Sequence, residues 1–406
     1  VETAFKAGAS GAMVDASKLE SLDVIKIAKD MGKELVVVDN TLRGLQDAAR
    51  VYLERFPGLL KIGITGSSGK TTTKEIAAAI IREEKNTVMN LGNLNSETGL
   101  PLSAFEVRSH HEAGIFELGM NRRGEIAELA AVLKPNIALI TNIGSAHIGI
   151  LGSKQAIAKE KKNIFSRFTG SEIALIPEDD EYRDFLAEGI TGQVRFYGPK
   201  SFKELGEIKD MGLEGSRIVW EGERIHFGLP GRHSLADALA ALAIAREIPL
   251  SRNAVKRGLE SARPLFGRGE IIRGRTTVIR DCYNANPESI DCALDFCDGL
   301  DWQGRRIYVI GDMLELGENS PAAHERIGRR LYASRADMVF LYGKETAAAK
   351  AFMQDRPFFH FSDMGELGRA LDGFVQSGDL VLLKGSRRCA LEQLSAMLAG
   401  SNGGAA

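Results

Sequence analysis

The sequence contains little that favours a secreted, membrane-spanning or nucleic-acid-binding protein. Its four cysteines (Cys282, Cys292, Cys297 and Cys389) show no CxxC spacing, which argues against a zinc site and a disulfide framework. No apolar run approaches the length of a membrane span. The formal net charge is only −2, so no general attraction to nucleic acid or to a membrane surface is implied. These features predict a cytoplasmic protein with reduced thiols, without membrane insertion and without a nucleic-acid partner.

The composition is that of an ordinary soluble globular protein. Hydrophobic residues make up 44% and charged residues 26% of the 406 positions, which is enough material for two or three domains. Val1 opens directly into a helical pattern, so we expect the chain to begin inside a domain. Residues 1–58 are predicted to form a partial α/β unit, with strands at 11–14 and 34–38 and a helix at 41–56.

One glycine-rich stretch organises the remaining chain. An apolar run at 59–64, typical of a buried strand, leads into Thr65-Gly66-Ser67-Ser68-Gly69-Lys70-Thr71-Thr72, and a helical pattern follows. Strand, glycine-rich turn and helix form the context in which backbone N–H groups and a helix N-terminus cradle phosphates. The sequence therefore predicts a nucleoside triphosphate site in which Lys70 bridges phosphates and Thr71 holds Mg²⁺.

Strands and helices alternate on both sides of a linker at 264–269. Before it, a central domain at 59–263 has predicted strands at 59–65, 113–118, 137–141 and 172–176, and predicted helices at 70–84, 124–133, 153–168, 234–246 and 251–261, with a hairpin between 193 and 228. A second domain, which begins with the linker, covers 264–399 and has predicted strands at 276–281, 306–311, 337–342 and 379–384. Its predicted helices are at 288–298, 320–333, 344–354, 364–375 and 389–399. Ser234 and Asp237 resemble a helix-capping pair. Residues 400–406 are predicted to be a disordered tail.

Two polar residues follow strands of the central domain. Glu117 ends the strand at 113–118, where a carboxylate could share the Mg²⁺ of the phosphate loop, although a solvated strand end is an equal alternative. His147 lies in a glycine-containing loop after the strand at 137–141, where a surface histidine is the simpler interpretation. The helix predicted at 153–168 carries a run of lysines, which predicts a solvated helix face formed by Lys159, Lys161 and Lys162.

Two turns of the second domain could meet a nucleotide. Asn284 and Asn286 stand between a strand and a helix, where they could cap the helix or read a base or ribose. The run Lys384-Gly385-Ser386-Arg387-Arg388 also lies between a strand and a helix, and it is either an anion-binding corner or ordinary surface charge.

Several runs in order along the chain resemble the Mur ligases, the amide-forming enzymes of peptidoglycan precursor synthesis. Beyond the phosphate loop, the matching segments are Asn93-Leu94-Asn95, Gly99 to Leu102, Glu117 to Asn121, Thr141 to His147, Gly231-Arg232-His233, Tyr283 to Pro287, Gly311 to Gly317 and Lys384 to Arg387. The resemblance implies a three-domain architecture: a partial N-terminal UDP-substrate domain, a central P-loop ATPase sheet and a C-terminal Rossmann-like domain. It also implies the branch of the family that joins D-alanyl-D-alanine to UDP-N-acetylmuramoyl-tripeptide through an acyl phosphate, acting as a cytoplasmic monomer.

The resemblance also implies roles for single residues. The catalytic group is Lys70, Glu117, His147 and Lys161, and Thr71, Glu117, His147 and Lys161 hold two Mg²⁺ ions. Lys161 stands at the family's carbamylated position, fourteen residues beyond His147. On this resemblance, ATP is held by the phosphate loop from Thr65 to Thr72 and also by Arg268, Asn284 and Asn286. The peptide substrates are contacted by Asn95, Ser96, Lys384, Ser386 and Arg387.

Three departures from the family's pattern stand out. Ser68 replaces a frequent Asn, and Ser234 and Asp237 replace two Asn residues, of which the second helps to read adenine. The family's uridine-binding segment precedes the position of Val1, so we expect this chain to bind the UDP substrate poorly.

Three alternatives stay open at this stage. They are a sister ligase that adds another amino acid or extends folate, a P-loop switch or regulatory ATPase without ligase chemistry, and a degenerate scaffold. The Asn-Ala-Asn-Pro run at 284–287 and the run at 311–317 argue against the first. The retained lysines, carboxylate and histidine argue against the third.

Overall fold

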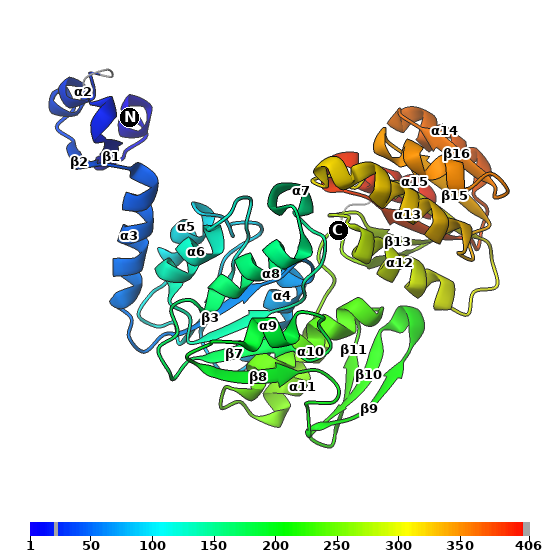
Figure 1. Cartoon of the computed structure of the whole chain (residues 1–406), viewed down its shortest axis with the longest axis horizontal. Helices are drawn as coiled ribbons and strands as arrows, with labels where there is room; N and C mark the ends of the chain where they lie inside the picture. Colours follow the sequence, from blue (N-terminus) through cyan, green and yellow to red (C-terminus); the bar gives the residue numbers. More distant parts are fainter. Residues whose placement is uncertain (20–22, 401–406) are drawn as a thin grey trace.

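The computed structural model describes residues 1–19 and 23–400, and its sheets fall into three consecutive regions (Figure 1). The N-terminal region (1–38) holds a parallel pair, β1 (Gly11–Asp15) and β2 (Glu34–Val38), together with α1 (Glu2–Lys6), η1 (Ala16–Lys18) and α2 (Val24–Asp30). Both strands were predicted from the sequence. The region stands apart from the others in Figure 1 and is joined to them through α3 (Thr41–Glu54).

The central region (60–261) is built on a six-stranded parallel sheet in the order β4-β5-β3-β6-β7-β8. Its strands are β3 (Leu60–Thr65), β4 (Thr87–Met89), β5 (Ala113–Glu117), β6 (Ile137–Ile140), β7 (Ile173–Pro177) and β8 (Gln193–Tyr197). β3 lies between β5 and β6, and all three run in the same direction. Their carboxyl ends therefore meet at one edge of the sheet, which is where ligands bind in sheets of this kind.

Helices cover both faces of this sheet. Ile137 and Leu139 of β6 pack in the core that contains α4 (Lys70–Ile81), α10 (Arg232–Arg246) and α11 (Arg252–Ser261). Ala138 and Ile140 point into the opposite core, which contains α6 (Glu125–Leu133) and α8 (Lys154–Lys162). The remaining helical segments of the region are α5 (Gly99–Ala104), α7 (Ile148–Leu151), η2 (Asn163–Phe165) and α9 (Arg183–Ala187). Burial on both faces explains why these strands read as continuous apolar runs.

A three-stranded antiparallel sheet follows β8, in the order β11-β10-β9. The short segment η3 (Gly212–Glu214) lies between β9 and β10 along the chain. The predicted hairpin is confirmed as β10 (Ser216–Trp220) and β11 (Glu223–Phe227), and β9 (Leu205–Asp210) adds a strand that the sequence pattern did not reveal.

The C-terminal region (264–399), which starts with the linker, has a second six-stranded sheet in the order β12-β13-β17-β14-β15-β16. Only its edge strand β12 (Glu270–Arg273) runs antiparallel, beside β13 (Thr277–Asp281). The other strands are β14 (Arg306–Gly311), β15 (Met338–Tyr342), β16 (Phe358–Phe361) and β17 (Leu380–Lys384). The helical segments are α12 (Pro287–Gly299), η4 (Gly317–Asn319), α13 (Ser320–Tyr332), η5 (Glu345–Phe352), α14 (Met364–Phe374), η6 (Arg387–Cys389), η7 (Leu391–Leu394) and α15 (Ser395–Ala399). The predicted α/β class with two nucleotide-fold-like sheets is confirmed.

Some predicted elements differ from the structure. The helix expected at 153–168 ends at Lys162 and tightens into η2, the one expected at 344–354 is the 3₁₀ segment η5, and that expected at 389–399 is split into η6, η7 and α15. Ser234 and Asp237 are not caps, because α10 already begins at Arg232 and both side chains are buried inside it. Of the predicted tail, residues 401–406 lie outside the described residues.

Candidate active site

A cavity of about 530 Å³ lies at the carboxyl edge of the central sheet, between the central and C-terminal regions. The central region lines it with the phosphate loop and with the segments that follow β5 and β6. The C-terminal region adds the segment around Arg268, the turn from Asp281 to Ser289 and Lys384. The predicted residues that line it are Ser67, Ser68, Gly69, Lys70, Thr71, Thr72, Asn95, Glu117, His147, Arg268, Asn284, Asn286 and Lys384. Most of the predicted site is therefore brought together around one cavity.

Two glycines allow the phosphate loop its path. Gly66 has φ +153°, and a Cβ there would lie 1.8 Å from Thr141 Oγ1. Gly69 has φ +81° as the residue before α4, and a Cβ there would lie 2.1 Å from Asp237 Oδ1. Only glycine fits either position, because both the backbone conformation and the space exclude a side chain. Thr65 is buried beneath the loop, where its hydroxyl donates to the Leu118 carbonyl at 2.9 Å.

The loop after β6 supports the phosphate loop from the side. Thr141 Oγ1 and Asn142 Nδ2 donate to the Ser68 carbonyl at 2.6 and 3.0 Å, and the Ser68 N–H donates back to Asn142 Oδ1 at 3.1 Å. The Gly144 N–H donates to Ser67 Oγ at 2.8 Å. The Thr141 to His147 segment is thus hydrogen-bonded to the phosphate loop.

Two lysines share one acceptor beneath the loop. Lys70 Nζ and Lys161 Nζ donate to the Gly66 carbonyl at 2.9 and 2.8 Å. Burial lowers the pKa of Lys70, and it lowers the pKa of Lys161 well below the usual lysine value, with the Lys70 charge as the second cause. Lys161 is only 1% exposed, so the expectation of a solvated lysine face is wrong at this position.

Glu117 is a buried carboxylate at the loop. Its Oε2 accepts from Thr71 Oγ1 at 2.8 Å and its Oε1 accepts from Asn95 Nδ2 at 2.6 Å, while its backbone N–H donates to Asn90 Oδ1 at 2.9 Å. The alternative of a solvated strand end is therefore wrong. Among residues 1–19 and 23–400, no three His, Cys, Asp or Glu side chains gather closely enough to hold a metal ion alone. Thr71 and Glu117 fit a magnesium site of the kind in which phosphates and water supply the other ligands.

The C-terminal region reaches the phosphate loop directly. Arg268 donates through Nη2 to Thr71 Oγ1 at 3.1 Å and stacks over the Tyr283 ring, 4.1 Å from its centroid. Asn286 Nδ2 donates to Ser68 Oγ at 3.1 Å, while its Oδ1 caps α12 by accepting from the Ser289 N–H at 2.8 Å. The capping alternative is confirmed for Asn286, whose Nδ2 also contacts the phosphate loop, while recognition of a base or ribose stays a prediction.

The predicted peptide-binding residues are only partly gathered. Asn95 and Lys384 line the cavity, but Lys384 is buried and paired with Asp281 at 2.9 Å, and it also donates to the Asn284 carbonyl. Ser96, Ser386 and Arg387 lie outside the residues that line the cavity. Ser386 is buried and accepts from the Leu314 N–H at 2.9 Å, and Arg387 is paired with Glu392, so both have structural partners.

Sequence reasoning did not single out two carboxylates near this cavity, Glu288 and Glu315, and it related a third, Asp237, only to helix capping and to a family position that reads adenine. Glu288, in the first turn of α12, accepts from Ser145 Oγ at 2.6 Å and lies 3.5 Å from Lys154 Nζ. Glu315 Oε2 lies 3.3 Å from His147 Nδ1, and Asp237 accepts from Thr73 Oγ1 at 3.3 Å. Each contact joins residues far apart in the sequence, and no local spacing signals it.

Asp237 is expected to make stability depend on pH. Burial raises the pKa of its carboxyl to about 8, so the folded state keeps a proton that the unfolded chain loses above about pH 4. Stability therefore falls as pH rises from about 4 to about 8. Asp237→Asn removes this titration, and its melting temperature should exceed the wild-type value by a margin that grows across this range. Calorimetry at several pH values checks this, with the exposed Asp355→Asn as control; a margin that is constant with pH would contradict it.

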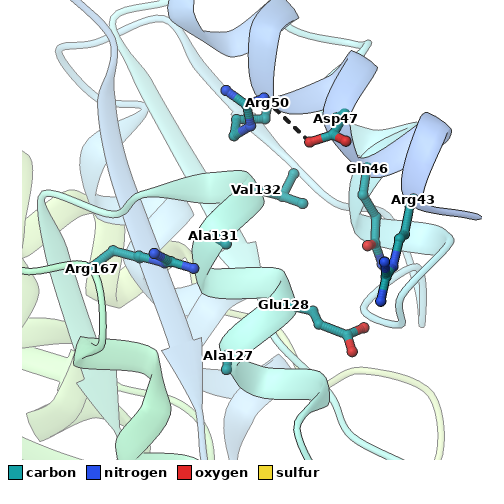
Figure 2. A pocket seen from close by; sticks show the side chains of 9 residues that line it. All are labelled: Arg43, Gln46, Asp47, Arg50, Ala127, Glu128, Ala131, Val132 and Arg167. Carbon is teal, nitrogen blue, oxygen red and sulfur yellow. Dashed lines mark hydrogen bonds and ion pairs between the residues drawn. The ribbon is translucent and has the colours of Figure 1, made fainter.

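A smaller hollow of about 290 Å³ lies between α3 and α6 (Figure 2). Its lining combines Arg43, Arg50 and Arg167 with Asp47 and Glu128. Arg50 is paired with Asp47 at 3.2 Å, as Figure 2 shows, and Glu128 is bound by Arg122 on its far side. The hollow contains none of the predicted site residues, and its opposite charges do not form a site for one kind of ion.

Comparison with known proteins agrees with this arrangement. Residues 64–245 match the family model of the Mur ligase middle domain, and residues 267–387 match that of the Mur ligase, glutamate ligase domain. A protein of Treponema pallidum named UDP-N-acetylmuramoyl-tripeptide–D-alanyl-D-alanine ligase is 43% identical over 402 residues, which cover 98% of this chain and 87% of the relative. The Escherichia coli protein of the same name is 29% identical, over 96% of this chain and 85% of the relative.

Solved structures give the same result. MurF from Acinetobacter baumannii superposes with a TM-score of 0.86 at 27% identity, covering 96% of this chain and 90% of that one. MurF ligase from Thermotoga maritima in complex with ADP superposes with a TM-score of 0.81 at 26% identity, covering 96% and 94%. Two models of the family match consecutive regions of the chain, and one relative is 43% identical over 98% of this chain. The chain therefore belongs to the Mur ligase family.

Proposed function

We propose that this chain is an ATP-dependent ligase that joins D-alanyl-D-alanine to UDP-N-acetylmuramoyl-tripeptide in peptidoglycan precursor synthesis. The observation that carries the proposal is the cavity in which Arg268 and Asn286 of the C-terminal region contact the phosphate loop of the central region. The names of the relatives from Treponema pallidum and Escherichia coli supply the two substrates. We infer a monomer acting in the cytoplasm; among the described residues, none of the helices has the length and apolar character needed to span a membrane.

Each step of the proposed reaction has residues suited to it. A carboxylate is a poor electrophile, so its oxygen first attacks the γ-phosphorus of ATP, ADP leaves, and an acyl phosphate forms. Lys70 lies at the N-terminus of α4, where its charge would stabilise the phosphates during transfer. Arg268 beside Thr71 would add a second cation from the other region. The amine of D-alanyl-D-alanine then attacks the acyl carbon, and the tetrahedral intermediate loses phosphate and a proton to leave the amide.

Thr71 and Glu117 would hold one Mg²⁺ at this site, and His147 with Lys161 would hold a second. Magnesium bound there would neutralise phosphate charge. We infer that Lys161 is carbamylated by CO₂, because burial lowers the pKa of its amine and so favours the neutral form that reacts with CO₂. A carbamate would place an anion beside the Lys70 ammonium, so that the two side chains would attract rather than repel each other. Asn95, which binds Glu117, would lie on the peptide side of the cavity.

Phosphate release in an omission experiment tests the function. The assay contains the protein, ATP, Mg²⁺, bicarbonate, UDP-N-acetylmuramoyl-tripeptide and D-alanyl-D-alanine, and each component is left out in turn. Release that requires both the tripeptide and the dipeptide supports the ligase. Release that requires the tripeptide but is indifferent to the dipeptide would favour a sister ligase, and release that requires neither would favour a simple ATPase.

A further inference from the structure

The central and C-terminal regions touch backbone to backbone at one point beside the cavity. α7 of the central region packs against η4 of the C-terminal region. A Cβ on Gly149 would lie 2.6 Å from the Gly317 nitrogen and 2.8 Å from the Glu315 oxygen. The three nearest atoms outside α7 all belong to the C-terminal region, so a side chain at 149 would collide with that region at this contact.

Two residues at this contact have a backbone conformation that side chains disfavour. His147 and Glu315 both have φ +65°, in the left-handed region. Such conformations persist where the surroundings fix them, and they occur often at functional sites. His147 Nδ1 lies 3.3 Å from Glu315 Oε2, within ion-pair distance but without the geometry of a hydrogen bond. That nitrogen is buried and has no hydrogen-bond partner among the described residues.

The loop that carries His147 is also held by a second carboxylate of the C-terminal region. Glu288 accepts from the Ser145 hydroxyl at 2.6 Å and from the Ser145 N–H at 3.3 Å. Ser145 is two residues before His147, and the side chain of His147 itself lines the cavity. The C-terminal region therefore contacts this segment at three residues, Ser145, His147 and Gly149.

We propose that Glu315 is the positioning residue for His147, supplied by the C-terminal region when the two regions close. This inference rests on the proposed function, in which His147 is a metal ligand. A histidine that binds a metal commonly donates its other ring N–H to a carboxylate, which fixes the tautomer and the ring orientation. With the ring oriented in this way, Glu315 Oε2 would accept the Nδ1–H of His147, and Nε2 would be left for the ion. His147 is ready to bind metal only in the closed arrangement, so ion binding and closure support each other.

Mn²⁺ binding tests this without relying on catalysis. The full chain is saturated with a non-hydrolysable ATP analogue, and bound Mn²⁺ is counted by electron paramagnetic resonance. Glu315→Ala should weaken the more weakly held ion by about tenfold, the lower end of the range for such partners. Glu315→Gln, which keeps an acceptor oxygen, should lose less. Gly149→Ala should weaken it as well, because its Cβ prevents the approach while both side chains stay intact.

The matched control is Glu318→Ala, which removes an exposed carboxylate of η4 that does not line the cavity. It should bind both ions as the wild type does. Wild-type Mn²⁺ binding in both Glu315→Ala and Gly149→Ala would overturn the inference. Failure of the omission experiment with the wild type would instead remove the proposed function, and the Mn²⁺ titration would still show whether Glu315 and the contact at Gly149 affect ion binding.

Discussion

Lys70→Ala is expected to lower the rate of ATP-dependent phosphate release by roughly 10³-fold, the upper range for removing one group that stabilises a transition-state charge. Lys70 is the first residue of α4, and its Nζ reaches the Gly66 carbonyl inside the phosphate loop. Burial already lowers the pKa of Lys70, which means that its charge is poorly solvated and is best stabilised by an incoming phosphate. Phosphate release at saturating ATP measures the effect.

The control for this change is Lys85→Ala. Lys85 lies just beyond the far end of α4 and is paired with Glu112 at 3.7 Å, away from the cavity. It should keep the wild-type rate. Calorimetry with ADP separates binding from chemistry, because ADP lacks the γ-phosphate and should lose less affinity than the rate loses. A Lys70→Ala protein that turns over at the wild-type rate would remove Lys70 from the mechanism.

Lys161→Met is expected to separate function from stability. The side chain is among the largest fully buried ones, and methionine nearly preserves its volume while removing the amine. Replacing a buried charge by an apolar group of similar shape is often neutral or stabilising, so the melting temperature should be unchanged or higher. Ligation should nevertheless fall by at least about 10²-fold, as for loss of one electrostatic group of the active site.

Carbamylation provides a second measurement at the same residue. With ¹³C-bicarbonate, the wild type should give a carbamate signal in the NMR spectrum and Lys161→Met should not. Lys159→Met, an exposed position on the same helix, is the control and should match the wild type in rate and signal. A Lys161→Met variant with the full ligation rate would contradict the role of Lys161, and a wild type without the signal would contradict its carbamylation.

The sequence was sufficient where signals are local. The phosphate loop, the parallel strands at its sides and most helices of both sheets follow from short-range patterns, because burial on both faces produces apolar runs and turns produce glycine. The edge strands β12 and β16 were missed because each is short and only partly buried, whereas β6, equally short, is buried along its whole length and reads as an apolar run. The solvated interpretation of Lys161 failed for another reason, since an isolated lysine on a helix does not reveal which tertiary surface covers it.

Contacts across the cavity could not be predicted from one sequence. His147 and Glu315 lie in different regions, and neither their spacing nor their residue types indicate a pair. Asp237 was interpreted as a cap because Ser234 and Asp237 have capping spacing, but Gly231 with φ +89° lets α10 begin earlier and turns Asp237 toward the phosphate loop. Such contacts depend on how the two regions meet, which is a property of the whole chain.

The shared lining of the large cavity has a consequence for the order of events in each turnover. Arg268 and Asn286 contact the same loop that would hold the nucleotide, so we expect a spent nucleotide to leave after these contacts separate. Turnover would then be paced by this opening rather than by bond formation, as in many enzymes that enclose their substrates. Solvent viscosity should accordingly slow steady-state turnover while leaving the first round of chemistry unchanged.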